Sequence, residues 1–579
     1  MPPSWQALAR AKRQTITNQI PPSWRIDEPP YSESSSSAAD RPTAPTDTEH
    51  QQQNITGTYP HQFLTPREIE ITENDVLDSL NLIHSGHWTC VEVTRAFCHR
   101  ASLAHQLTNC LHELCLEQAI MDATHLDSYF EQHGTPIGPL HGMLVSLADC
   151  YHVKGMQTSL GYVEWIGAVE GAEAGLQSEV VKGLKELGAI CFCKTAVPQA
   201  LLGIQCTNNI VGRVLNPFNR RLSSGGSSGG EGALVSQHGS MVGMGSDRGG
   251  GVRITSSYNG LYGLRPSTGR ISHQGVRTSM DGQDTILPVV GPIARSISTL
   301  RLIMQSLLGA QPWLHDPLVL ELPWRTQQEA EILSIINSPA HDPSSIKQLC
   351  FGMLRTDGLS VPQPPVQRAL RMAASALIKK GHRIIEWDPP THVQAYQVAL
   401  TTFLSDGGKD VHKTLATSGE PMTESVRLLY GAAPVAETTS SSIMATNKQK
   451  RDFQVAYLKY WMSTSAVSGT GRPVDAIISP VSTSPATRTT GNLVDGHCIW
   501  VDVLDYTSVV IPVTSVDKDL DALDMATQGG NPLDREVRED FDIGIYEGLP
   551  VGLQVVGQRL QEEKALALAE LLVHALETL

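Results

Sequence analysis

The chain has 579 residues, and its 44 basic and 59 acidic side chains give it a formal net charge of −15 at neutral pH. This excess of acid counts against binding to nucleic acid or to an anionic membrane, because both need clustered cations. Ten cysteines without regular spacing exclude a disulfide framework, and the lack of a secretory leader or of an apolar run of about 18 residues leads us to expect a cytoplasmic protein.

The first stretch with a distinct composition is polar and low in complexity. It covers about residues 27–56, where prolines, a serine run and three consecutive glutamines leave too little apolar surface for folding. We therefore expect residues 1–60 to form a partly disordered amino-terminal segment and residues 61–579 to form one large domain.

Regular helical signals begin at Thr89, which opens a capping box with Glu92. Apolar residues follow at helical spacing, so the pattern predicts a helix from this point. A second amphipathic helix is predicted over 180–187. Gly188 ends it, and the apolar run 189–193 is typical of a strand.

The second half of the chain alternates a polar region with short apolar runs. Residues 310–420 are more polar and irregular, and we expect them to form a variable lobe on the main domain. The apolar runs 476–479, 509–514 and 551–557 are bounded by Gly or Pro and are typical of buried strands of one mixed sheet. Apolar residues at steps of three and four predict a closing helix over 562–579.

Two glycine-rich runs in the middle of the chain are the strongest indication of a functional site. The first is SSGGSSGGE from Ser223 to Glu231, and the second is GSDRGGGVR from Gly245 to Arg253. Glycines at this density let backbone N–H groups approach a ligand closely and bind a developing anion.

These runs resemble the signature of the amidase signature family of serine amidohydrolases, most closely its acetamidase-like, fungal-type branch. The resemblance extends from about residue 64 to the carboxyl end. It is supported by the further runs GPLHG at 138–142, TNNIVGR at 207–213, NGLYGLRPS at 259–267 and GLPVGLQ at 548–554. The resemblance implies a single α/β domain with a mixed, mainly parallel central sheet flanked by helices. It also implies hydrolysis of carboxylic amides through a serine, serine, lysine triad.

Two of the three positions implied for that triad carry the wrong residue. The bridging serine falls on Ser227, but the nucleophilic serine falls on Gly251 and the lysine falls on Ala148. The separation 251 − 227 = 24 is the one expected of the two serines. Lys154 occupies a family position of its own, so it is not a displaced catalytic lysine. An unaided hydroxyl is a poor nucleophile and needs an adjacent base.

We therefore expect an amidase-like hydrolase scaffold that is catalytically impaired or inactive, so the resemblance alone leaves open whether the chain is an enzyme. A ligand pocket should survive, with the backbone from Arg248 to Gly251, including Gly249 and Gly250, forming an anion-binding nest. Asp247 and Arg253 would support that loop. The expected ligand is a small amide or carboxylate.

Two alternatives stay open at this point. One is an active amidase of small-molecule or specialised metabolism with a rerouted nucleophile or an Asp247-activated water, the candidate nucleophiles being Cys150, Ser246, Ser228 and Thr255. The other is a non-catalytic partner protein. We expect no cofactor and no metal, because no His-x-x-x-His or Cys-x-x-Cys pattern occurs. A homodimer stays open.

Overall fold

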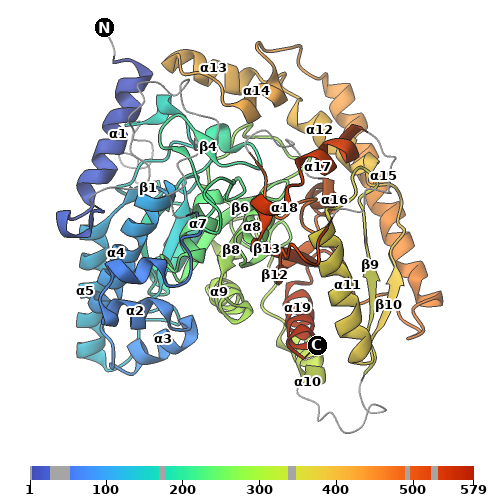
Figure 1. Cartoon of the computed structure of the whole chain (residues 1–579), viewed down its shortest axis with the longest axis horizontal. Coiled ribbons are helices and arrows are strands. Elements are labelled where there is room, and N and C mark those ends of the chain that lie inside the picture. Colours follow the sequence, from blue (N-terminus) through green and yellow to red (C-terminus); the bar gives the residue numbers. More distant parts are fainter. Residues whose placement is uncertain are drawn as a thin grey trace.

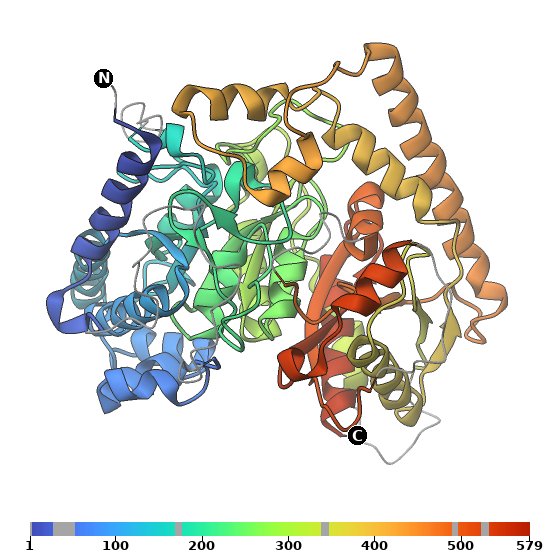
Figure 2. The ribbon, with the colours of Figure 1, turned by 45° about the horizontal axis from the view of Figure 1, so that its top comes forward.

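The computed structural model, shown in Figures 1 and 2, describes residues 3–26, 53–167, 176–336, 347–488, 496–522 and 532–578. The predicted polar linker falls mostly on residues 27–52, outside the described residues. The predicted division of the chain at residue 60 stays a prediction.

One large mixed sheet runs through the molecule and holds the structure together. It has eleven strands, whose order across the sheet is β1 (Leu111–Leu114), β3 (Ile190–Thr195), β2 (Leu144–Ala148), β6 (Val242–Asp247), β8 (Val289–Ala294), β7 (Tyr262–Arg265), β12 (Thr507–Ser515), β13 (Pro550–Gly557), β11 (Ala476–Pro480), β9 (Cys350–Met353) and β10 (Arg383–Glu386). A short ribbon joins β4 (Thr207–Asn208) to β5 (Gly212–Arg213). The α/β fold with a mixed central sheet is confirmed, but the expectation of a mainly parallel sheet is wrong.

Strand direction accounts for that correction. Among the described strands of the large sheet, four neighbouring pairs are parallel: β2 with β3, β2 with β6, β9 with β10 and β9 with β11. The other six pairs are antiparallel. A short apolar run bounded by Gly or Pro is buried equally well in either direction, so its pattern predicts a strand without fixing its direction.

Helices cover both faces of the sheet, as Figures 1 and 2 show. They are α1 (Trp5–Gln19), α2 (Pro66–Glu73), α3 (Val76–His84), α4 (Cys90–Thr108), α5 (Leu116–His133), α6 (Glu179–Glu186), α7 (Gly229–Ser236), α8 (Gly251–Tyr258), α9 (Ile297–Gly309), α10 (Thr326–Ile336), α11 (Pro364–Lys379), α12 (Val393–Phe403), α13 (Lys409–Ser418), α14 (Glu424–Tyr430), α15 (Ser440–Ser463), α16 (Gly496–Leu504), α17 (Pro532–Asp540), α18 (Ile543–Tyr546) and α19 (Glu562–Glu577).

The helices predicted from the sequence are present, but the capping box predicted at Thr89 is only half formed. Thr89 caps α4 by accepting a hydrogen bond from the amide of Glu92, while the Glu92 carboxylate pairs with Arg67 instead of closing the predicted box. Helix α6 is followed by Gly188 at φ +94°, where a Cβ atom would lie 2.7 Å from the Cα atom of His141. Only glycine fits that turn into β3. The three predicted strands in the second half are β11, β12 and β13, and the closing helix is α19.

Helix α1 and residues 310–420 also pack against the rest of the domain. Helix α1 buries Ala9, Lys12 and Ile16 beside β1, and the Lys12 ammonium pairs with Glu113. Residues 310–420, predicted to form a variable lobe, contain β9 and β10, which extend the sheet at one edge.

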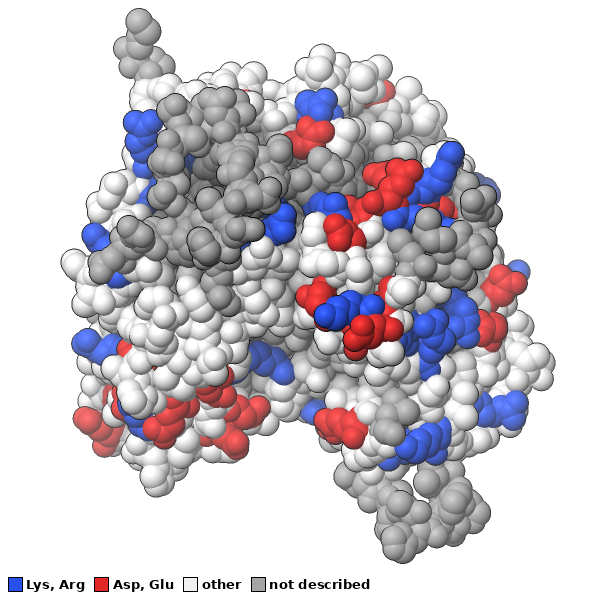
Figure 3. Space-filling view, viewed as in Figure 1, with Lys and Arg blue, Asp and Glu red and all other residues white. Residues whose placement is uncertain are grey.

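Charged residues of both signs are mixed over the face in Figure 3, with acidic side chains gathered at the lower left, over α2 and α3. Within the described ranges, no helix has the length and apolar character needed to cross a bilayer.

Helix α7 carries a carboxyl group, Glu231, into the interior between α7 and the sheet. The hydroxyls of Ser146 in β2 and Thr195 in β3 both donate to it, that of Thr195 at 2.8 Å. Among the described residues, no cation forms an ion pair with it. Burial raises the pKa of Glu231 to about 8, and the two hydroxyls offset only part of this effect.

We predict that Glu231→Gln becomes more stable relative to the natural chain as pH rises. The folded chain holds this proton more tightly than the unfolded chain, so the stabilisation by the protonated carboxyl is complete below about pH 4.5 and is lost as pH rises through about 8. Gln cannot ionise. Between about pH 5 and 8, the free energy of unfolding of the natural chain should therefore fall by about a few kcal/mol relative to that of the variant.

Urea unfolding across this pH range measures the difference. Glu186→Gln, at an exposed position of α6, serves as the matched control and should show no such trend. A constant difference for Glu231→Gln would mean that the buried carboxyl is already ionised in the folded chain.

Candidate functional site

The first glycine-rich run forms a buried loop that leads into α7. It contains Ser227, which follows a cis peptide bond from Gly226 and is only partly buried. A Cβ atom on Gly226 would lie 2.5 Å from the carbonyl oxygen of Gly203, so the chain passes too close to its neighbour for any other residue. The backbone next to Ser227 is therefore packed directly against that of Gly203.

The second run forms the turn between β6 and α8, and the Asp247 carboxylate holds this turn in shape. Asp247 accepts hydrogen bonds from the amides of Gly250, Val252 and Arg253, while those of Gly249 and Gly251 are not among its donors. Gly249 and Gly250 adopt φ values of +122° and +114°, a region that favours glycine.

A buried ion network anchors the same turn to the rest of the molecule. The Arg253 guanidinium binds Asp247 at 2.8 Å and Asp502 at 2.7 Å, and Asp502 also accepts from Arg265 at 2.9 Å. Burial would raise the pKa of Asp247, but the adjacent Arg253 and the loop amides outweigh it and hold the pKa at about 2. Asp247 therefore stays ionised, and its side chain belongs to the core.

The two runs meet at Gly251. A Cβ atom built on Gly251 would lie 2.7 Å from the Ser227 Oγ atom and 2.2 Å from the backbone carbonyl oxygen of Ser246. The structure therefore brings positions 227 and 251 together, as the resemblance implies. The backbone carbonyl of Ser246 occupies the space that a side chain at position 251 would need.

Ala148 lies at the end of β2, at the same edge of the sheet. Strands β2 and β6 are parallel neighbours, with Leu147 paired to Met244, so their carboxyl ends point the same way. Ala148 follows directly after Leu147 and is fully buried, while Gly251 begins the helix that follows β6. Neither position carries an amine or a hydroxyl.

The four alternative nucleophiles are all buried. Burial raises the pKa of the Cys150 thiol to about 12, so this group is a protonated thiol and a poor nucleophile at neutral pH. The Ser228 hydroxyl bonds to the backbone of Ser246, accepting from its amide at 3.2 Å and donating to its carbonyl at 3.4 Å. Ser246 is 5% exposed, and Thr255, which belongs to α8, is fully buried.

Sequence reasoning missed a buried lysine beside this edge. Lys194 in β3 stands opposite Leu147 in the sheet register, and its ammonium pairs with Asp149 at 2.7 Å. It also donates to the Thr158 hydroxyl at 2.8 Å and to the Gln157 carbonyl. A charged residue inside the apolar run ICFCKT was the available signal. These three acceptors occupy the ammonium, so it is not free to act as a base at Ala148. Lys154 is exposed.

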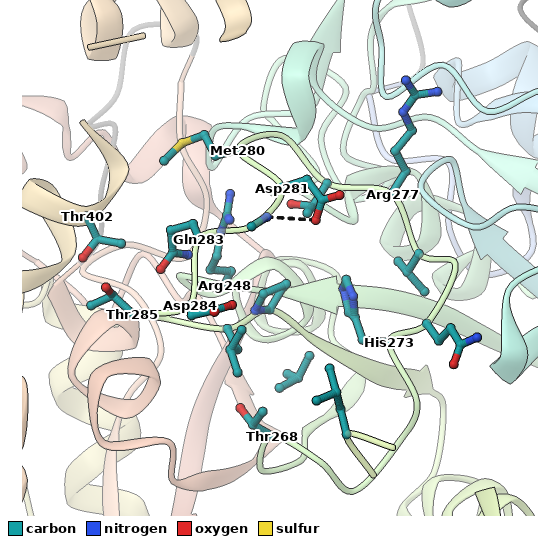
Figure 4. Close-up of a pocket in the computed structure, with 18 of the residues that line it drawn as sticks. Arg248, Thr268, His273, Arg277, Met280, Asp281, Gln283, Asp284, Thr285 and Thr402 are labelled. Carbon is teal, nitrogen blue, oxygen red and sulfur yellow. Dashed lines mark hydrogen bonds between the residues drawn. The ribbon is translucent and has the colours of Figure 1, made fainter. Parts of the chain in front are cut away.

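A cavity of about 1360 Å³ opens beside the second run. Of the residues predicted to form the site, Arg248 alone lines it, whereas Ser227, Asp247, Gly249, Gly250 and Gly251 do not. Figure 4 shows Arg248 among the lining side chains, with Gln283 and Asp284 on one side of it and His273 on the other. The described cavity therefore reaches the glycine-rich loop at Arg248.

Comparisons with known proteins agree on one family. A family model described as Amidase matches residues 92–566, which include both glycine-rich runs and Ala148. The chain is 37% identical over 572 residues to an acetamidase of Emericella nidulans and 38% identical over 568 residues to an acetamidase of Aspergillus oryzae, with 98% of each chain covered in both comparisons. A solved structure called fatty acid amide hydrolase matches with a TM-score of 0.86 at 32% identity, covering 98% of this chain and 94% of that one.

The crowding at Gly251 predicts that a side chain there destabilises the fold. Gly251→Ala and Gly251→Ser both place a Cβ atom against the Ser246 carbonyl, and relief requires movement of the backbone between β6 and α8. We expect each variant to lower the free energy of unfolding by about 1–3 kcal/mol.

Urea unfolding tests this expectation, with Gly309→Ala as the matched control. Gly309 ends α9, and a Cβ atom there meets nothing within 4 Å, so that variant should be neutral or slightly stabilising. Equal stability of Gly251→Ala and the natural chain would mean that the loop still has room for a nucleophile.

Proposed function

The chain belongs to the amidase family, and on that premise we propose that it is a catalytically silent member that binds a small amide, acyl or carboxylate ligand without hydrolysing it. The single observation that carries this proposal is the pair of residues at the edge of the sheet. Ala148 offers no base and Gly251 offers no nucleophile, while Ser227, the bridging serine that the resemblance implies, is present and lies beside Gly251.

The expected loss of rate is large. Where a nucleophile and its base act as a unit, removing either one costs roughly 10⁶ in kcat, and about 10³ to 10⁴ over water survives from oxyanion binding and substrate binding. Losing both groups therefore removes nearly all acyl transfer by the triad route. The cavity of about 1360 Å³ is lined by neither Ala148 nor Gly251, so it does not depend on the side chains missing there.

The surrounding groups give little support to a rerouted reaction. Cys150 is a buried thiol with a raised pKa, and Ser228 is bonded to the backbone of Ser246. Asp247 has a pKa of about 2 and pairs with Arg253, so it is too weak a base to activate water. The binding role is favoured over a pure partner-protein role because the cavity remains open beside the loop.

We predict that the purified chain releases no ammonia above background from acetamide, hexanamide or benzamide. The physical reason is the absence of both a side-chain nucleophile at Gly251 and a base at Ala148. A coupled assay for ammonia, run beside an active acetamidase as positive control, measures the rate.

Ser227→Ala is the discriminating variant. In a silent protein the removal of this hydroxyl changes nothing that the assay detects. Turnover by the natural chain that Ser227→Ala abolishes would contradict the proposal and identify Ser227 as part of a working site.

A further inference from the structure

The Arg248 guanidinium forms no direct ion pair within the described part of the protein, although the Asp502 carboxylate attracts it electrostatically. Its guanidinium donates one long hydrogen bond, from Nη2 to the Ser279 carbonyl at 3.4 Å, and lies 5.6 Å from the centre of the Phe403 ring. Within the described ranges it takes part in no ion pair, and the nearby Asp284 is exposed. Partial desolvation lowers the pKa of Arg248, although the residue keeps some exposure where it lines the cavity.

A carboxylate in the cavity would satisfy that cation. A guanidinium presents parallel N–H donors in a planar fork that matches the two oxygens of a carboxylate. An arginine keeps its proton in a protein interior, so the positive charge is present at neutral pH. The cavity meets the glycine-rich loop at this side chain, which would place the anion beside that loop.

The rest of the lining limits how much negative charge a ligand can carry. Arg248 and Arg277 are the two arginines of the lining, against five acids, which are Asp281, Asp284, Asp316, Asp406 and Asp410. This excess of acid repels a polyanion more strongly than a monoanion, because the repulsion grows with the charge of the ligand. Leu287, Val289 and Met280 supply apolar surface in the same cavity, which suits an uncharged carbon chain.

We propose that Arg248 makes this cavity a binding site for a small organic monocarboxylate, with the carboxylate on the guanidinium and the apolar body in the cavity. This inference rests on the proposed silent function and names its ligand class. A cation fixed beside a working amidase centre would hold the carboxylate product better than the neutral amide substrate, which opposes turnover. In a protein that only binds, the same preference is the specificity.

Hexanoate and hexanamide test the proposal as a matched pair, since they share a carbon chain and differ in charge. Isothermal calorimetry with the natural chain should give roughly ten-fold or tighter binding of hexanoate over hexanamide, because a hydrogen bond to a charged group is worth that much. Arg248→Met should abolish this preference and leave hexanamide binding within about two-fold, so retained hexanamide binding shows that the variant is folded.

Arg277→Met is the matched control in the same cavity. Arg277 lies over the Trp165 ring at 3.5 Å, away from the loop, and its removal should leave the preference for hexanoate unchanged. Pyrophosphate should not bind the natural chain. The proposal is overturned if the natural chain does not bind hexanoate, if Arg248→Met keeps the preference, or if pyrophosphate binds as tightly as hexanoate.

Ammonia measured in the hexanamide samples separates the two proposals. Ser227-dependent release of ammonia would refute the silent function even where Arg248 governs hexanoate binding. Absence of ammonia together with equal binding of the two probes would refute only the role of Arg248.

Discussion

The buried ion network centred on Arg253 is the constraint on which the rest of the site depends. Asp247 in β6 and Asp502 in α16 both pair with the guanidinium. Asp247 also accepts hydrogen bonds from the amides of the turn. Removing one partner of such a buried pair typically costs about 3–5 kcal/mol, because it leaves a charge unpaired. The network therefore fixes the turn between β6 and α8 whether or not a nucleophile stands at Gly251. Arg248 belongs to that turn and lines the cavity. A protein can lose its chemistry and keep this shape because the scaffold and the reacting groups are different residues.

Much of the fold could be predicted because its signals are local. Thr89 predicts the start of α4 because it caps that helix. Gly188 predicts the turn into β3 because only glycine fits there. The closeness of positions 227 and 251 also follows from sequence, through the spacing of two glycine-rich runs that resemble a known signature. Each of these inferences needs only a few neighbouring residues or a recognised motif.

The features that sequence could not supply are those set by distant contacts. The direction of each strand depends on how the chain returns to the sheet, so the antiparallel majority was missed. Gly251 is crowded by the carbonyl of Ser246. The Lys194 ammonium is held by the Asp149 carboxylate and by the carbonyl of Gln157. Arg248 was expected to contribute backbone to an anion site, whereas its side chain is the part that lines the cavity. No periodicity or motif in the sequence indicates any of these arrangements.

Positions 148 and 251, at the end of β2 and the start of α8, carry neither a base nor a nucleophile, and this links the family scaffold to the proposed binding role. Covalent labelling tests it most directly. The natural chain, incubated with a serine-reactive fluorophosphonate and then examined by intact-mass spectrometry beside an active acetamidase, should keep its unmodified mass while the acetamidase gains one adduct. A single stoichiometric adduct on the natural chain, mapped by peptide analysis to Ser227, Ser246 or Cys150, would contradict the account.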